Sequence, residues 1–118
     1  MIEIVIYEGK NGRISAFRVH GHSGTAPRGR DIVCAGVSAL AQTALLGLGR
    51  HLHREVSYKI DPSGDLQMKL VEAPDDFTEA ILKTMRLGLE EIAKASPNAV
   101  RLRISREYPG GEGYEFCV

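Results

Sequence analysis

A histidine and a cysteine separated by twelve positions are the side chains in this sequence best suited to chemistry. His22 closes the segment His20-Gly21-His22, and Cys34 follows twelve residues later. A thiolate attacks carbonyl carbon, and a nearby histidine takes up a proton and later returns it. The pair therefore predicts the nucleophile and the general base of a cysteine protease.

Asp31 is predicted to place Cys34 at the start of a helix. Its carboxylate is a good N-cap for free backbone amides, and an apolar run follows from Ile32 to Leu48. Cys34 then falls in the first turn, where the helix dipole favours a thiolate and free amides can hold an oxyanion. Asp31 either caps the helix only or also orients the histidine as a third catalytic residue. Ser38, one turn beyond Cys34, either steadies the site or bonds to its own helix backbone.

Hydrophobic periodicity predicts the elements that position this pair. Two turn signals each join a pair of alternating segments into a hairpin, and a strong turn at 96–98 stops a second helix. Residues 21–30 hold three glycines and a proline, which predicts a flexible loop of functional length. The expected strands lie near 2–6, 13–20, 56–60, 66–70 and 100–104, and the helices near 32–48 and 75–95.

The order ββαββαβ favours an α+β fold, a two-layer sandwich with two helices on one face of a mostly antiparallel or mixed sheet. Each strand is expected to have one apolar and one polar face. The first helix is apolar nearly all round, which predicts burial on most sides, including a face against a partner subunit. The second helix is amphipathic, with an expected apolar stripe at Phe77, Ile81, Thr84, Met85, Gly88 and Ile92.

Length and composition bound the class of protein. The 118 residues predict a single domain over 1–118. Lys and Arg total 15, as do Asp and Glu, so a strongly basic nucleic-acid binder is disfavoured and no direct nucleic-acid partner is expected. We expect no membrane segment, because no uninterrupted apolar run reaches about 18 residues. The start shows no secretory signal, and Cys34 and Cys117 make no disulfide framework, so a cytoplasmic protein with reduced thiols is expected.

Two other functions compete with proteolysis. A zinc site is the first, but no Cys-x-x-Cys or His-Glu-x-x-His pattern supports it, so no metal is predicted. A non-enzymatic ribosome-associated module is the second, with four arginines as contacts to RNA phosphates. The zinc candidates are His20, His22, Cys34, His51 and His53, and the four arginines are Arg28, Arg30, Arg50 and Arg54.

The residues around the pair also carry a resemblance. Gly21-His22, Gly29, the run Asp31–Ala35 and the run Val37–Leu40 closely resemble the signature of the bacterial ribosomal-processing cysteine protease family, Prp. That signature reads roughly Gly-His-Ala, a short loop, then Gly-x-Asp-Ile-Val-Cys-Ala-Ala-Val-Ser. Ser23 and Gly36 stand where the family usually has alanine, and neither change removes a reacting group.

The resemblance implies a role for each matching residue. The family's nucleophile falls on Cys34, its catalytic histidine on His22, its aspartate on Asp31 and its serine on Ser38. Its flexible loop corresponds to residues 21–30, which makes Gly21, Gly29 and Arg30 supporting or substrate-binding residues.

The resemblance also implies a substrate. Family members remove a short N-terminal extension from a large-subunit ribosomal protein of the L-twenty-seven type. They are small homodimers, and the implied reaction needs no cofactor.

Overall fold

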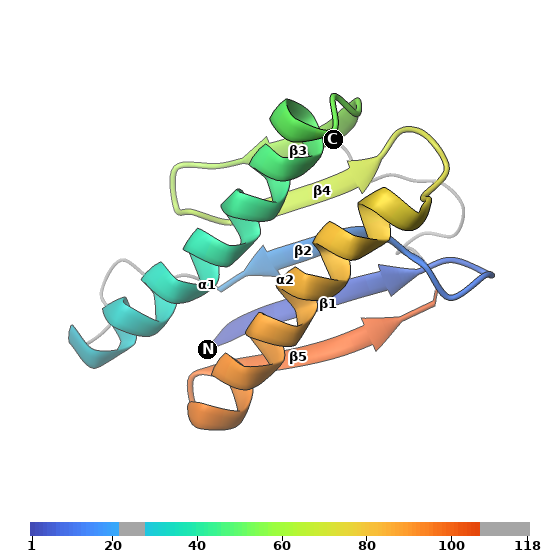
Figure 1. The fold of residues 1–118 in the computed structure, drawn as a ribbon. Helices are drawn as coiled ribbons and strands as arrows, with labels where there is room; N and C mark the ends of the chain where they lie inside the picture. The colour runs from blue at the N-terminus through green and yellow to red at the C-terminus, as the bar shows by residue number, and fades with distance from the viewer. Residues whose placement is uncertain (22–27, 107–118) are drawn as a thin grey trace.

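A computed structural model of the chain describes residues 1–21 and 28–106, with the side chains of 28–31 excepted. The described part is one sheet with two long helices packed on the same side (Figure 1). In chain order the elements are β1 (Ile2–Glu8), β2 (Ile14–His20), α1 (Arg28–Leu46), the π-helical turn η1 (Gly47–His51), β3 (Val56–Ile60), β4 (Leu66–Leu70), α2 (Asp76–Ala95) and β5 (Val100–Ser105).

The sheet is mixed, with the strand order β3-β4-β2-β1-β5. The hairpins β1–β2 and β3–β4 are antiparallel, as is the β2–β4 pair that joins them. β5 returns beside β1 in parallel after the chain has crossed the sheet in α2. The predicted α+β sandwich and its order of elements are confirmed.

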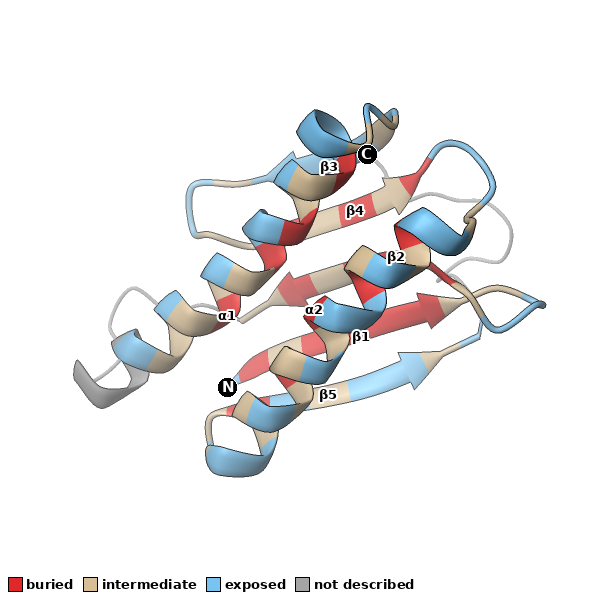
Figure 2. Ribbon diagram, in the orientation of Figure 1, coloured by how far each residue is buried: buried red, intermediate tan, exposed pale blue. Residues whose placement is uncertain are grey.

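The core lies between the sheet and the two helices. The inward faces of the strands and of both helices carry the buried positions in Figure 2. Alternation explains the strand contribution, because every second side chain points to the same face. The main contributors are Ile4, Ile6, Phe17, Val19 and Met68 from the sheet, Val37, Ala41 and Ala44 from α1, Leu48 from η1, and Leu82 and Leu89 from α2.

The prediction that every strand has one polar face is wrong for β1. Val5 and Tyr7 alternate with the core-facing isoleucines and yet are buried, together with Ala16 of β2, in a second cluster. β1 pairs with strands on both of its edges, so these side chains have neighbours on either side.

The apolar stripe of α2 agrees with the prediction in part: Met85 is buried and Ile81 and Ile92 pack against the core, but the other buried positions lie one residue further along. The buried residues are Thr78, Leu82, Met85 and Leu89, whereas Phe77 is 65% exposed. Adjacent stripes on a helix share the same period, so the sequence pattern alone did not determine which one faces the sheet.

Asp75 fixes the start of α2. Its side chain accepts hydrogen bonds from the amides of Phe77 and Thr78, and the Thr78 hydroxyl accepts one from the Asp75 amide. Arg54 donates to the second carboxylate oxygen at 2.6 Å. The Thr78 amide, and then Arg54, hold the pKa of Asp75 below its ordinary value of 3.8.

This lowered pKa predicts an acid-sensitive cap. The ionised carboxylate stabilises the folded state above the unfolded pKa, and this stability is lost as the pH falls through the lower folded pKa. In urea unfolding between about pH 5 and pH 2, we expect the Asp75→Asn variant to lose less stability than the wild type. Asparagine still caps a helix but does not titrate. Parallel curves for the two proteins would contradict the prediction.

A single chain buries only one side of helix α1, and the predicted face against a partner subunit stays a prediction. Val37, Ala41 and Ala44 face the core, but Ile32 and Leu46 are 75% and 47% exposed. A single sheet covers one side of a helix, and α2 lies beside α1 rather than over it (Figure 1).

The segment Ile32–His51 also corrects the expectation that no stretch reaches membrane-spanning length. An 18-residue window within it has a mean hydropathy of 1.8, so the 20-residue segment is long and apolar enough, by length and composition, to cross a bilayer. The prediction counted consecutive apolar residues, and Ser38, Gln42 and Thr43 interrupt that run. The mean hydropathy of the whole window stays high despite these three residues. Core helices of soluble proteins meet the same criterion, and this helix contributes to the core of the fold.

Candidate functional site

Cys34 lies on the second turn of α1, not on the first. The helix begins at Arg28, three residues before the predicted cap at Asp31. Arginine is a strong helix former, so Arg28 and Arg30 extend the helix upstream despite Gly29 between them. The amide of Cys34 is therefore expected to bond within the helix. The amides free to hold an oxyanion are those at the start of the helix, around 28–31.

The Cys34 side chain stands at the border between core and solvent. It is a free thiol, half-buried, and packs against the edge of the core together with Val33. Its neighbours Ile32 and Ala35 are exposed. Ser38 is half-buried four residues further along the same helix. A thiol in this position has a rigid support and an open side from which a substrate can approach.

Gly21 marks the point where the chain leaves β2 toward His22. Its φ is +100°, a conformation that glycine adopts readily and other residues rarely do. A Cβ here would lie 2.3 Å from the Met1 carbonyl oxygen. The Gly21 amide donates to Oδ1 of Asp65 at 3.1 Å, across 44 positions of sequence. The position therefore requires glycine, for its conformation and for its close approach to the N-terminal strand.

Asp65 closes the tight turn between β3 and β4. Oδ1 of Asp61 accepts hydrogen bonds from the Ser63 amide, the Ser63 hydroxyl and the Asp65 amide. The Ser63 hydroxyl is the main cause that lowers the pKa of Asp61 below 3.8. The backbone of the turn is closed by a bond from the Asp61 amide to the Asp65 carbonyl at 3.0 Å.

The other predicted site residues are placed only in part. His22 lies outside the described residues. Gly29, Arg30 and Asp31 belong to α1 by their backbone, and their side chains lie outside the described part. The approach of His22 to Cys34 and both roles of Asp31 therefore stay predictions.

The sequence analysis did not find a role for Asp65. Asp65 is the last residue of the turn 61–65, one of the two turn signals that predicted the hairpins. No local signal marks its contact with Gly21, because pairing of β2 with β4 brings the two together.

The residues considered for zinc do not gather in the described part of the chain. Within residues 1–21 and 28–106, no group of three or more His, Cys, Asp or Glu side chains could hold a metal. Nε2 of His20 lies 3.7 Å from Oε1 of Glu3, and His51 and His53 are exposed near the end of η1. Arg54, considered for RNA contact, is paired with Asp75.

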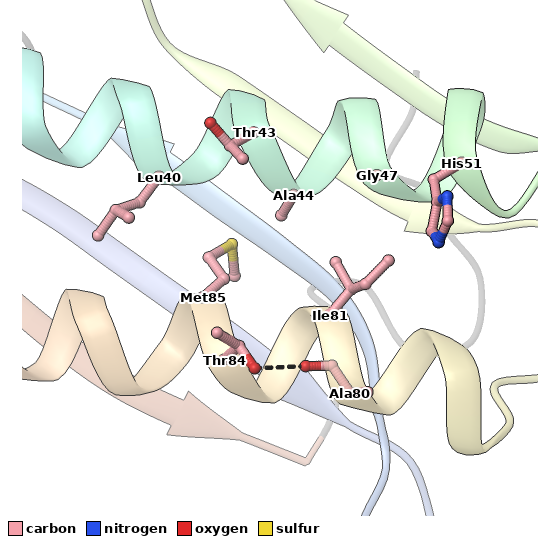
Figure 3. A pocket seen from close by; sticks show the side chains of 9 residues that line it. All are labelled: Leu40, Thr43, Ala44, Gly47, His51, Ala80, Ile81, Thr84 and Met85. Atoms are coloured by element: carbon pink, nitrogen blue, oxygen red, sulfur yellow. Dashed lines mark hydrogen bonds between the residues drawn. The ribbon is translucent and has the colours of Figure 1, made fainter.

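An apolar groove of about 430 Å³ runs between the helices (Figure 3). Among the residues that line the groove, the Thr84 hydroxyl donates a hydrogen bond to the Ala80 carbonyl oxygen at 2.6 Å. The lining residues are Leu40, Thr43, Ala44, Gly47, His51, Ala80, Ile81, Thr84 and Met85. None of them is a residue predicted to take part in catalysis, so the groove is separate from the candidate active site.

A family model described as cysteine protease Prp matches residues 1–101 of this chain. The chain belongs to this family. A ribosomal processing cysteine protease Prp from Staphylococcus aureus is 30% identical over 105 residues, which cover 86% of this chain and 97% of the relative.

Solved structures agree with the family assignment. The Staphylococcus aureus Prp structure with a covalently linked product peptide has a TM-score of 0.80 and 25% identity, over 89% of this chain and 100% of that one. The same Prp with a substrate peptide has a TM-score of 0.82 at 24% identity, with the same coverage, and supports the fold.

Membership of the Prp family decides between enzyme and binding module. The chain is a cysteine protease that acts on a peptide substrate. The alternative of a non-enzymatic ribosome-associated module is therefore set aside, and the resemblance seen in the segment from Gly21 to Leu40 is confirmed at the level of the family.

Proposed function

We propose that this protease removes the N-terminal extension of a large-subunit ribosomal protein of the L-twenty-seven type in the cytoplasm. The match of residues 1–101 to the Prp family carries this proposal. Its curated relative from Staphylococcus aureus is named for ribosomal processing. The free, half-buried thiol of Cys34 on α1 supplies the nucleophile that the proposal requires.

In the proposed reaction, the Cys34 thiolate adds to the carbonyl carbon of the scissile peptide bond. Amides at the start of α1 stabilise the negative oxygen of the tetrahedral intermediate. The carbon–nitrogen bond then breaks, and the His22 imidazolium gives its proton to the leaving amine. Water deprotonated by His22 attacks the thioester, which releases the new carboxyl end and restores the thiolate. Asp31 caps the helix or orients His22, and Ser38 supports the nucleophile.

The test is incubation of the purified chain with the full-length ribosomal precursor, followed by mass spectrometry of intact products. A single cut that frees the N-terminal extension is expected. The matched control is the precursor that already lacks the extension, which should stay uncut. An uncut full-length precursor, or cleavage at scattered sites in both proteins, would overturn the proposed substrate.

We further propose that the chain forms a homodimer through the exposed side of α1. Large apolar side chains are seldom left in water over a long helix face, and such faces commonly bind a partner. Ile32 and Leu46, 75% and 47% exposed, lie near opposite ends of this side, and the exposed residues between them are Ala35, Ala39, Gln42 and Thr43. A second copy of the same helix has the same length and the same apolar ends, which a two-fold arrangement can bring together.

Charge placed on this side of α1 should separate the subunits. We expect Ile32→Glu combined with Leu46→Glu to give a monomer in light scattering after size-exclusion chromatography, with the wild type a dimer. Burial of a carboxylate in an apolar interface without a partner is strongly unfavourable. Leu87→Glu, at a 52% exposed position on α2, is the matched control and should stay dimeric. A dimeric double variant would show that the interface lies elsewhere.

A further inference from the structure

We infer that Asp65 is a positioning residue for catalysis, because its carboxylate anchors the chain one residue before His22. The inference rests on the proposed role of His22 as the general base. Asp65 reaches no reacting atom in this scheme; it acts through the backbone of Gly21. The carboxylate oxygen Oδ1 accepts the Gly21 amide hydrogen bond at 3.1 Å.

This bond lies just beyond the end of the ladder between β2 and β4. Regular pairing of β2 with β4 ends at Val19 and Leu66. Gly21 lies two residues beyond Val19, outside the last strand residue, His20. The Asp65 side chain thus extends the hydrogen bonding between these two segments past the end of the ladder.

The turn that holds Asp65 is itself rigid. Oδ1 of Asp61 receives three hydrogen bonds within the turn, one of them from the Asp65 amide at 3.2 Å. The amide of Asp61 donates to the Asp65 carbonyl, and the Gly64 amide donates to the Asp61 carbonyl. Both backbone groups of Asp65 are therefore fixed, which limits where its carboxylate can lie.

The main chain at Gly21 is also restricted on the side away from Asp65, where it faces Met1. Its Cα faces the Met1 carbonyl so closely that no side chain fits between them. The main chain at Gly21 is therefore held between the N-terminal strand on one side and the Asp65 carboxylate on the other. This two-sided support fixes the main chain at Gly21, the residue that precedes His22 in the sequence.

A positional error of about 1 Å in a catalytic group can cost a hundredfold in rate. An anchor one residue from the general base should therefore affect turnover more than substrate binding. We expect Asp65→Ala to lower kcat by at least about tenfold with a smaller change in KM. Asp65→Asn keeps an acceptor oxygen at the same place and should restore kcat close to the wild-type value.

The experiment compares wild type, Asp65→Ala, Asp65→Asn and Ser63→Ala in the precursor cleavage assay, with amide hydrogen exchange at Gly21 measured by NMR on the same proteins. Ser63→Ala is the matched control. It weakens the same turn by removing the hydroxyl bond to Asp61 but leaves the contact with Gly21 in place. Faster exchange at Gly21 and a lower kcat are expected in Asp65→Ala only.

The outcomes separate this inference from the proposed function. His22→Ala is assayed alongside; if it cleaves like the wild type, the proposed role of His22 fails, and positioning by Asp65 fails with it. If His22→Ala is inactive and Asp65→Ala keeps its kcat and slow Gly21 exchange, the inference alone is overturned. Equal loss in Asp65→Asn and Asp65→Ala also overturns it. If the wild type leaves the precursor uncut, the proposed substrate is wrong. Amide hydrogen exchange at Gly21 in Asp65→Ala and Asp65→Asn then tests the anchor: unchanged slow exchange in Asp65→Ala would overturn it.

Discussion

Cys34→Ala is expected to abolish cleavage of the ribosomal precursor, with kcat lowered by at least about a thousandfold. Alanine removes the sulfur that forms the thioester and leaves the peptide backbone of α1 unchanged. The loss should therefore appear in kcat, and the free energy of unfolding should change little, because the thiol is only half-buried at the edge of the core. Mass spectrometry of the precursor after incubation gives the measurement.

Cys117→Ala is the matched control for this experiment, since it removes the second cysteine of the chain. It should cleave like the wild type, which would assign the activity to Cys34 and not to thiols in general. His22→Ala should lose activity as Cys34→Ala does, because the two side chains act in one step. For the same reason the losses from the two substitutions are not additive. An active Cys34→Ala protein would place the nucleophile elsewhere in the chain.

Phe17→Ala is expected to destabilise the fold by about 3–5 kcal/mol, the largest stability effect foreseen for a single substitution here. The ring is fully buried at the centre of β2, between the sheet and the helices. Its removal takes away apolar contacts and leaves a cavity that the rigid sheet cannot close. Urea unfolding followed by circular dichroism measures the change as a lower midpoint at an unchanged slope.

Phe77→Ala provides the comparison, because it is the same substitution at a position on α2 that is largely exposed. We expect its free energy of unfolding to stay within about 0.5 kcal/mol of the wild type. The contrast between the two variants isolates burial from the loss of a phenyl ring. Equal destabilisation by both would mean that the ring of Phe77 is covered in solution, for example by a partner subunit.

The stability of β2 and the chemistry are linked through the end of that strand. Phe17 is paired with Ile6 and Met68 on the neighbouring strands, and the ladder with β1 continues to His20, which is paired with Glu3. Gly21 and then His22 follow directly. A strand paired with β1 and β4 therefore supports Gly21, the residue before the proposed general base, and the bond from Gly21 to Asp65 is the last described part of that support.

Local features of this protein could be read from the sequence by itself. The hairpins followed from alternating apolar residues around strong turns. The start of α2 was expected near residue 75, where Asp75 is the N-cap, because capping depends on residues within one turn. The fold class followed from the order of these elements. The chemistry of the Gly21–Leu40 segment was recognisable too, since its residue types and spacing are distinctive, and the family comparison agrees.

Only the tertiary structure decided features that depend on packing or on distant partners. It turned Leu82 rather than Phe77 toward the sheet, and it left much of α1 exposed because a single sheet covers one side of a helix. The helix also started earlier than the capping signal at Asp31 suggested, which moved Cys34 to its second turn. The contact of Gly21 with Asp65 arises only when β2 pairs with β4. Its energy depends on a long-range geometry that no local pattern of residues encodes.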